Sequence, residues 1–70
     1  MKYLIIIEKS ATGYSAYSPD LPGCVSTGET REAAEANMHE AITFHLNGLK
    51  AEGLEIPPPS SSSAYVVVAA

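Results

Sequence analysis

The chain contains two unbroken apolar runs but only one segment with helical periodicity, and this combination limits most strongly what it can fold into. The runs are YLIII, residues 3–7, and AYVVVAA, residues 64–70. Continuous runs of β-branched and aromatic residues are typical of strands buried on both faces of a sheet. A single helix covers only one face of a sheet. The sequence therefore predicts that the other face needs a second covering layer.

Two shorter strand segments follow the first run. YSAYS, residues 14–18, stops at Pro19, whose nitrogen cannot donate a ladder hydrogen bond. CVST, residues 24–27, is the next candidate strand. Between them, Pro22 and Gly23 suit the central positions of a type II turn, because proline presets a negative φ and glycine accepts a positive one. We expect three successive strands joined by tight turns.

The segment from Thr30 to about Glu52 is predicted to be an amphipathic helix. Thr30 suits the N-cap position, and Gly53 stands where a C-terminal stop is expected. At ~100° per residue, one apolar stripe forms along the helix. It comprises Ala34, Met38, Ala41, Ile42, His45 and Leu49. A Pro/Ser linker, residues 57–63, then leads to the last run as an extended segment.

The predicted element order is βββαβ, which places the chain in the α+β class. A right-handed crossover brings the last run back parallel to the first, giving a sheet of order 3-2-1-4 with the helix on one face. The uncovered face then exposes aliphatic side chains, and the last strand forms an uncharged edge. Candidate residues for this open face or for an oligomer contact are Leu4, Ile6, Val66 and Val68. We expect a homo-oligomer, a dimer or higher.

Length and charge exclude several classes of function. The 70 residues allow one domain, residues 1–70. The formal net charge is −4 and the four cations lie far apart, so the clustered basic footprint of a nucleic-acid binder is absent. The first apolar run is too short for a bilayer span or a secretory signal, which favours a cytoplasmic protein without membrane contact. A basic protein is the partner that this charge favours.

The residue types used in catalysis and metal binding do not form a recognisable pattern. Asp20 has no second carboxylate at useful spacing, and Cys24 has no partner cysteine and no nearby base. His39 and His45 diverge by ~120° around the helix, so they cannot share a metal ion. We expect no catalytic residue, no cofactor-binding residue and no metal site.

Four residues are candidates for contact with a partner protein: Asp20, Glu29, Glu32 and Phe44. Asp20 lies in a proline-rich loop, where it either stabilises the turn or faces a basic partner. Glu29 and Glu32 place negative charge near the positive end of the helix. Phe44 lies off the centre of the apolar stripe, where it either flanks the core or contacts a partner.

Several segments together resemble the HicB family, the antitoxins of HicA/HicB toxin–antitoxin pairs. These are YSPDLPGC, TGET, EAAEANMHEAITFHLNGL and IPPPS, and the resemblance runs from Tyr3 to Val68. It implies a partial ribonuclease H-like fold, βββαβ. It also implies that the chain binds a small basic HicA-type toxin, which cleaves mRNA with a histidine, and blocks the active site of that toxin.

Two departures from the family pattern are visible. Ala33 stands where the family usually has an acidic residue, which weakens the cap formed by Thr30. Many HicB proteins also continue into a DNA-binding domain, and residues 1–70 contain none, so we expect no direct DNA binding from this stretch. The alternatives to an antitoxin are a stand-alone self-associating HicB-like domain and a metal-dependent ribonuclease. For the latter, Glu8 at a strand end and the outward-facing Glu40 are not expected to meet.

Overall fold

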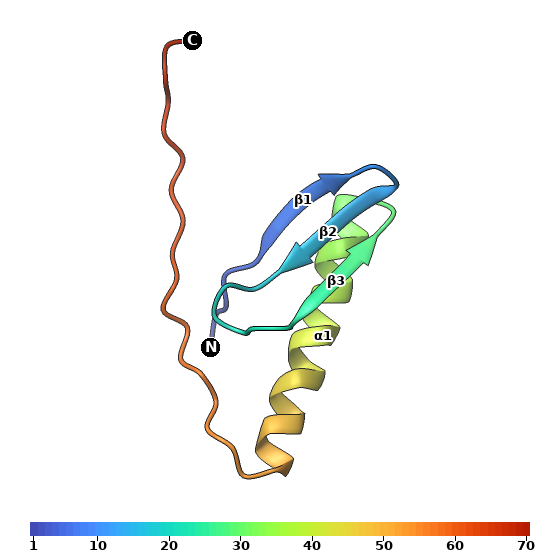
Figure 1. Ribbon diagram of the computed structural model, residues 1–70, viewed down its shortest axis with the longest axis vertical. Coiled ribbons are helices and arrows are strands. Elements are labelled where there is room, and N and C mark those ends of the chain that lie inside the picture. The colour runs from blue at the N-terminus through green and yellow to red at the C-terminus, as the bar shows by residue number, and fades with distance from the viewer.

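The computed structural model describes residues 1–70 as a three-stranded antiparallel sheet with one helix packed on one face (Figure 1). The sheet order is β1-β2-β3, so each strand pairs with the next one along the chain. This confirms the α+β class and the predicted neighbours among the first three strands. The elements are β1 (Ile6–Ser10), β2 (Gly13–Tyr17), β3 (Val25–Gly28) and α1 (Arg31–Ala51).

The register of the strands decides which side chains meet the helix. Ile7 lies opposite Ala16, and this row faces α1, where Ala16 is buried in the core. Ile6 lies opposite Tyr17, which in turn lies opposite Val25. Because side chains alternate across a sheet, this second row faces away from the helix. Tyr17 and Val25 are exposed there. The uncovered face therefore carries a row of apolar side chains, and the sequence predicted exposed apolar residues on this face but not these two.

The core is small. Six of the 70 residues are buried, and Leu21 and Met38 are the two largest side chains that are fully buried. The radius of gyration is 13.8 Å, whereas a compact chain of this length is expected to have about 11 Å. A single copy therefore buries little of its apolar surface.

Two consecutive turns form the corner between β2 and β3. The amide of Leu21 donates to the carbonyl of Ser18 at 3.2 Å, and the amide of Cys24 donates to the carbonyl of Leu21 at 3.1 Å. Gly23 has a φ of +81°, as the third residue of a type II turn requires. The predicted turn is confirmed. The corner also inserts Leu21 into the core, which the sequence pattern did not indicate.

The start of α1 lies tightly against the end of β3. Thr30 is the N-cap, and its hydroxyl accepts a hydrogen bond from the amide of Ala33 at 3.0 Å, as predicted. A Cβ atom on Gly28 would lie 2.4 Å from the backbone nitrogen of Ala34. This close approach explains why the strand ends in glycine immediately before the helix begins.

The other end of α1 is closed by a Schellman motif. The amide of Leu54 donates to the carbonyl of Leu49 at 2.9 Å, and the amide of Gly53 donates to the carbonyl of Lys50 at 3.1 Å. A helix of 21 residues is about 32 Å long, about twice the length of a five-residue strand. The second half of α1 therefore extends beyond the sheet (Figure 1).

The predicted fourth strand does not form within one chain, so the order 3-2-1-4 is wrong for the single copy. Residues 57–70, here called the tail, run extended beside β1 without joining the sheet (Figure 1). The hydroxyl of Tyr3 donates to the carbonyl of Pro57, and Asp20 accepts hydrogen bonds from Ser60 and Ser61. These anchors direct the tail away from the spacing of ~4.8 Å that strand pairing requires.

Candidate protein-binding surfaces

Asp20 holds the root of the tail through four hydrogen bonds. Its Oδ2 accepts from the backbone N–H groups of Ser60 and Ser61, both at 3.0 Å. Its Oδ1 accepts from the two hydroxyls, at 3.0 Å from Ser60 and 2.8 Å from Ser61. The Ser61 backbone N–H, followed by the Ser61 hydroxyl and the Ser60 groups, lowers the pKa of Asp20 below its usual value. The carboxylate is therefore engaged within the chain as an anion.

This clamp is a role for Asp20 that the sequence analysis missed. We expected Asp20 to stabilise its own turn or to face a partner, whereas its hydrogen bonds join it to a segment 40 residues away. The four consecutive serines, residues 60–63, were the available signal, because adjacent amides and hydroxyls form a set of donors suited to a carboxylate. Contact between Asp20 and another protein stays a prediction.

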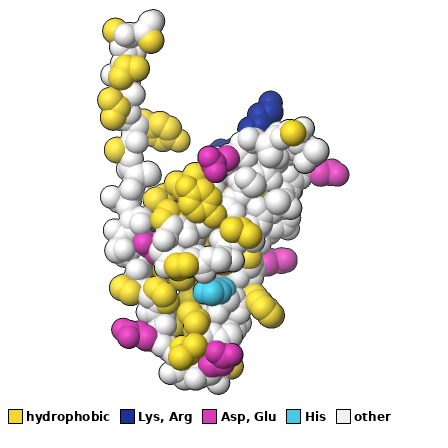
Figure 2. All heavy atoms as spheres, viewed as in Figure 1, with side chains coloured by type: hydrophobic (Ala, Val, Ile, Leu, Met, Phe, Trp, Pro, Cys, Tyr) yellow, Lys and Arg dark blue, Asp and Glu magenta, His cyan; other side chains and the backbone are white.

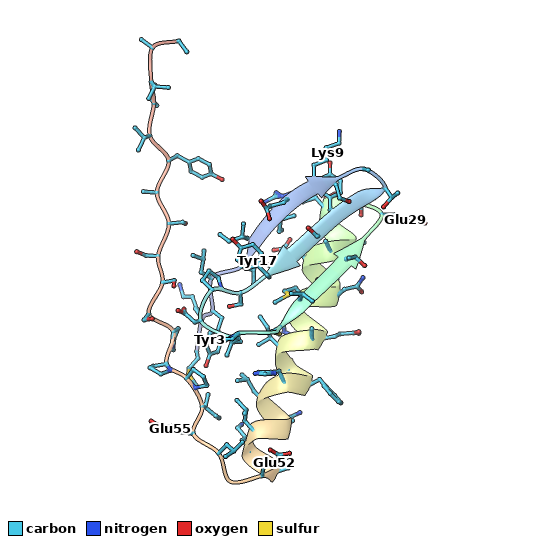
Figure 3. The ribbon with its side chains drawn as sticks, viewed as in Figure 1. Tyr3, Lys9, Tyr17, Glu29, Glu52 and Glu55 are labelled. Carbon is cyan, nitrogen blue, oxygen red and sulfur yellow. The ribbon has the colours of Figure 1, made fainter.

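The other acidic candidates lie far from this clamp. Glu29 follows β3 directly and is exposed at the end of the sheet near the β1–β2 hairpin (Figure 3). Glu32 is exposed in the first turn of α1. Asp20 precedes β3 in the chain, so the strand separates it from both glutamates. The three acidic residues therefore do not form one site, and their contact with a partner stays a prediction.

Phe44 points into solvent from the half of α1 that extends beyond the sheet. Its side chain is 82% exposed. This settles one alternative, because Phe44 does not flank the core. It lies in a shallow open hollow on the helix surface, whose other lining residues are His39, Glu40, Thr43 and Asn47. Its role in binding a partner stays a prediction.

The remaining chemically active side chains are dispersed. Cys24 is 5% exposed, and burial raises the pKa of its thiol. His39 is exposed and His45 is half-buried, as the helical stripe predicts. No three side chains of His, Cys, Asp or Glu lie close enough together to hold a metal ion. The protein also has no helix with the length and apolar character needed to cross a membrane.

An open groove separates the outer edge of β1 from the tail, and we call it the β1 groove. Leu4 and Ile6 line it and are half-buried. The groove encloses about 380 Å³, a volume that packed protein interiors do not leave empty, so the tail and β1 are not packed together here. The complete lining is Tyr3, Leu4, Ile5, Ile6, Ile7, Arg31, Glu35, Ser63 and Tyr65.

The tail side of the β1 groove is formed by Ser63 and Tyr65, and the apolar end of the tail continues beyond the groove. Tyr65 is 100% exposed, and Val66, Val67 and Val68 are also exposed. Figure 2 shows hydrophobic side chains along the tail and on the neighbouring part of the sheet. The structure thus places Leu4 and Ile6 in the wall of the groove, whereas Val66 and Val68 lie further along the tail and are not part of the groove lining. Their part in an oligomer stays a prediction.

Two surface residues were missing from the predicted set. Tyr17 and Val25 continue the row that begins with Ile6 on the uncovered face, and both are exposed. The signal was present in YSAYS, because alternation places Tyr17 on the face opposite to the buried Ala16. The hydrogen bond from Tyr3 to the tail was not anticipated either.

Comparison with known proteins identifies a family. Residues 3–68 match the family described as the HicB-like antitoxin of bacterial toxin–antitoxin systems. An uncharacterised 14.9 kDa protein of Haemophilus phage HP1 is 41% identical over 66 residues, covering 94% of this chain and 50% of the phage protein. A UPF0150 protein of Thermoplasma acidophilum is 41% identical over 67 residues, covering 94% of this chain and 97% of that protein.

A named antitoxin and a solved structure also match. Antitoxin HicB 2 of Photorhabdus laumondii is 34% identical over 71 residues, covering 100% of this chain and 51% of the antitoxin. A chain of the HicA3 and HicB3 toxin–antitoxin complex superposes with a TM-score of 0.73 and 37% identity, covering 84% of this chain and 70% of that chain. The chain thus spans about half the length of the phage protein and of the Photorhabdus antitoxin, and nearly all of the Thermoplasma protein.

Proposed function

The chain belongs to the HicB-like family of bacterial antitoxins, and from this premise we propose that it binds and neutralises a small, basic, mRNA-cleaving toxin of the HicA type. The neutralisation is by protein–protein occlusion, in which the antitoxin covers the active site of the toxin. The observation that carries the proposal is the likeness, in both sequence and fold, to a chain of a HicA–HicB complex.

The charge of the chain supports a basic partner. The formal net charge is −4, from eight acidic and four basic residues. Opposite net charges accelerate encounter and disfavour acidic competitors, although they add less to final affinity. Acidic side chains are present on the surface of the molecule around the exposed apolar residues (Figure 2).

Phe44 is the residue that we propose as the apolar anchor of the toxin contact. Aromatic side chains dominate the binding energy of many interfaces when they fill a pocket on the partner. Phe44 is exposed on a rigid helix, so little conformational entropy is lost when it is buried. Glu40, one turn earlier, lines the same hollow and supplies negative charge at the rim.

We further propose that the β-sheet and helix form a partial ribonuclease H-like scaffold without enzymatic activity. The antitoxin family suggests a non-enzymatic role. In this proposal the fold presents binding surfaces, and the RNA-cleaving histidine belongs to the toxin.

The test is an RNA cleavage assay with the toxin encoded by the neighbouring reading frame. Added in equimolar amount, the full chain is expected to abolish cleavage, and on its own it is expected to cleave nothing. Replacing Phe44 with alanine is expected to weaken toxin binding by about 30-fold or more, the effect of losing a hot spot of ~2 kcal/mol. Isothermal titration calorimetry measures the affinity.

Val25→Ala is the matched control, because Val25 is an exposed apolar residue on the open face of the sheet. It is expected to bind the toxin as the unaltered chain does. If the valine variant loses affinity and the Phe44 variant does not, the toxin binds the sheet and the assignment of α1 is wrong. Continued cleavage in the presence of excess antitoxin would contradict the proposed function itself.

A second candidate is a self-associating HicB-like domain that has no toxin partner. The exposed apolar tail favours this candidate, because it is a surface for another polypeptide irrespective of any toxin. The two candidates differ in the neighbouring reading frame: a small basic protein with one histidine supports the antitoxin.

A further inference from the structure

We propose that two copies of this chain exchange their tails, each laying residues 64–70 into the β1 groove of the other. In the resulting sheet, the tail of the first copy lies between β1 and the tail of the second copy. The tail of the second copy lies in the same way between β1 and the tail of the first copy. This assigns the groove an occupant, a second copy of the chain. The inference concerns self-association alone and holds irrespective of any toxin.

The surface area of the single chain is larger than expected for a compact monomer. The single chain exposes 5401 Å². A compact monomer of 7.4 kDa is expected to expose about 4,200 Å², so this chain has an excess of about 1,200 Å². A standard protein interface buries about 800 Å² on each partner. The excess is large enough to supply such an interface without using the remaining surface of the domain.

Each copy lacks a strand partner that the other copy can supply. β1 is an edge strand, so one side of its backbone has no strand partner, and the apolar residues before it line the groove. The tail is rich in β-branched residues and also has no strand partner. Unpaired edges and unpaired strand formers are templates for intermolecular pairing. Exchange between two copies gives β1 and the tail a hydrogen-bonded strand partner in both copies. The resulting dimer is closed by two-fold symmetry.

The tail is long enough to reach β1 of a neighbouring copy. The clamp on Ser60 and Ser61 fixes the point where the tail leaves the domain. The nine residues that follow span about 30 Å when extended, whereas the five residues of β1 span about 17 Å. The tail is therefore long enough to lie along the full edge of β1 in a neighbouring copy. Figure 1 shows it projecting beyond its own domain.

The tail and the apolar run at residues 3–7 carry no charged side chain. Edge strands usually avoid such pairing through charged side chains. On β1 these are Glu8 and Lys9, in the second half of the strand, so the first half and the residues before it are unprotected. Pairing along residues 3–7 therefore brings no charged side chain of either segment into the contact. Arg31 and Glu35 line the groove, and both are exposed. A two-fold axis perpendicular to the sheet makes the inserted tail antiparallel to β1.

Proline substitutions test the exchange, with mass measured by light scattering over a range of concentrations. Val66→Pro and Val67→Pro remove neighbouring backbone donors, which point to opposite sides of a strand. A strand with a neighbour on both sides tolerates neither change. Both variants are expected to weaken dimerisation by more than about a hundredfold, because each dimer carries the change twice.

A control variant and a check of folding accompany the two proline variants. Ser62→Pro lies between the clamp and the exchanged residues and is expected to leave the dimer intact. The helical signal of the variants in circular dichroism is expected to match that of the unaltered chain, because residues 64–70 belong to no helix or strand of the single copy, whereas any strand signal from the exchanged tails is lost with the dimer. A monomer at all concentrations, or a dimer that both proline variants leave unaffected, overturns the proposal. If only one of the two variants dissociates the dimer, the tail is an edge strand and insertion is wrong.

Cysteine cross-linking distinguishes exchange from a tail that folds back on its own sheet. Chains carrying Leu4→Cys are mixed with chains carrying a cysteine at residue 65, 66 or 67, so that the register is sampled. A disulfide between the two kinds of chain is expected at one of these positions, since bridging needs Cα atoms within about 7 Å. A disulfide that forms only when both cysteines are in one chain overturns the proposal.

Discussion

Two glycines, Gly28 and Gly48, are expected to respond in opposite directions to the same substitution by alanine. At Gly28 a Cβ atom would lie 2.4 Å from the backbone nitrogen of Ala34 and 2.8 Å from the carbonyl carbon of Ala33. At Gly48 a Cβ atom would meet no atom within 4 Å. The first site is the contact between β3 and the start of α1, and the second is an open position on the helix.

The expected magnitudes follow from these contacts. Gly48→Ala should raise the free energy of unfolding by about 1 kcal/mol, because alanine loses less backbone entropy in a helix. Gly28→Ala should lower it by about 1–3 kcal/mol, since the crowding atoms belong to the backbone and cannot rotate away. A domain of this size has a total stability of about 4–10 kcal/mol. The two variants should therefore differ by a large fraction of that stability.

Urea unfolding followed by circular dichroism measures both effects. All samples are compared at one protein concentration, because self-association would make stability depend on concentration. The slope with denaturant is expected to be unchanged, which shows that the same surface unfolds. In thermal melts, 1 kcal/mol corresponds to about 4–8 °C. A Gly28→Ala chain as stable as the unaltered protein, or a destabilised Gly48→Ala chain, would refute the reasoning.

Three further results are expected. Met38→Ala should lower the free energy of unfolding by about 2–5 kcal/mol, because Met38 is one of the two largest fully buried side chains, and a smaller loss in urea unfolding would mean that the core collapses around the gap. The hydrogen bonds between Asp20 and the tail should be complete above the usual pKa of Asp20, 3.8, and should weaken as pH falls below it, because the folded-state pKa is lowered. The NMR shifts of the Ser60 and Ser61 amides measure this, and a titration of these shifts above pH 3.8 would contradict it. Cys24 should react with a disulfide reagent at pH 8 far more slowly than in the urea-unfolded chain, because burial shields the thiol and raises its pKa; equal rates would show that the thiol is accessible.

Local features of the fold could be predicted because they depend on residues close in the chain. The type II turn at Pro22 and Gly23 follows from the φ values that these two residues accept. The cap at Thr30 and the stop at Gly53 follow in the same way from the hydrogen-bonding needs of helix ends. Each of these features joins residues no more than about five positions apart.

The candidate site was predicted less well, because its contacts join segments far apart in the chain. The exposure of Phe44 depends on α1 being longer than the sheet that it covers. The hydrogen bonds from Ser60 and Ser61 to Asp20 span 40 and 41 positions, and no periodic pattern indicates them. The acidic residues are close in sequence, but β3 separates Asp20 from Glu29 in space.

The sequence by itself determined the order of the strand, turn and helix segments up to Gly53, the direction of the helical stripe and the surplus of apolar residues over what one helix can cover. It placed the first strand too early, because β1 begins at Ile6 and not at Tyr3. It also determined that residues 64–70 favour an extended conformation, because β-branched side chains restrict χ1 in the same way wherever they are placed.

Only the tertiary structure decided where that last segment lies. Pairing with β1 within the chain and projection away from it use the same extended backbone, so local propensity does not distinguish them. The choice depends on the anchors at Tyr3 and Asp20, which fix the position and direction of the tail through long-range hydrogen bonds. A strand segment is a property of neighbouring residues, whereas its partner is a property of the assembled molecule.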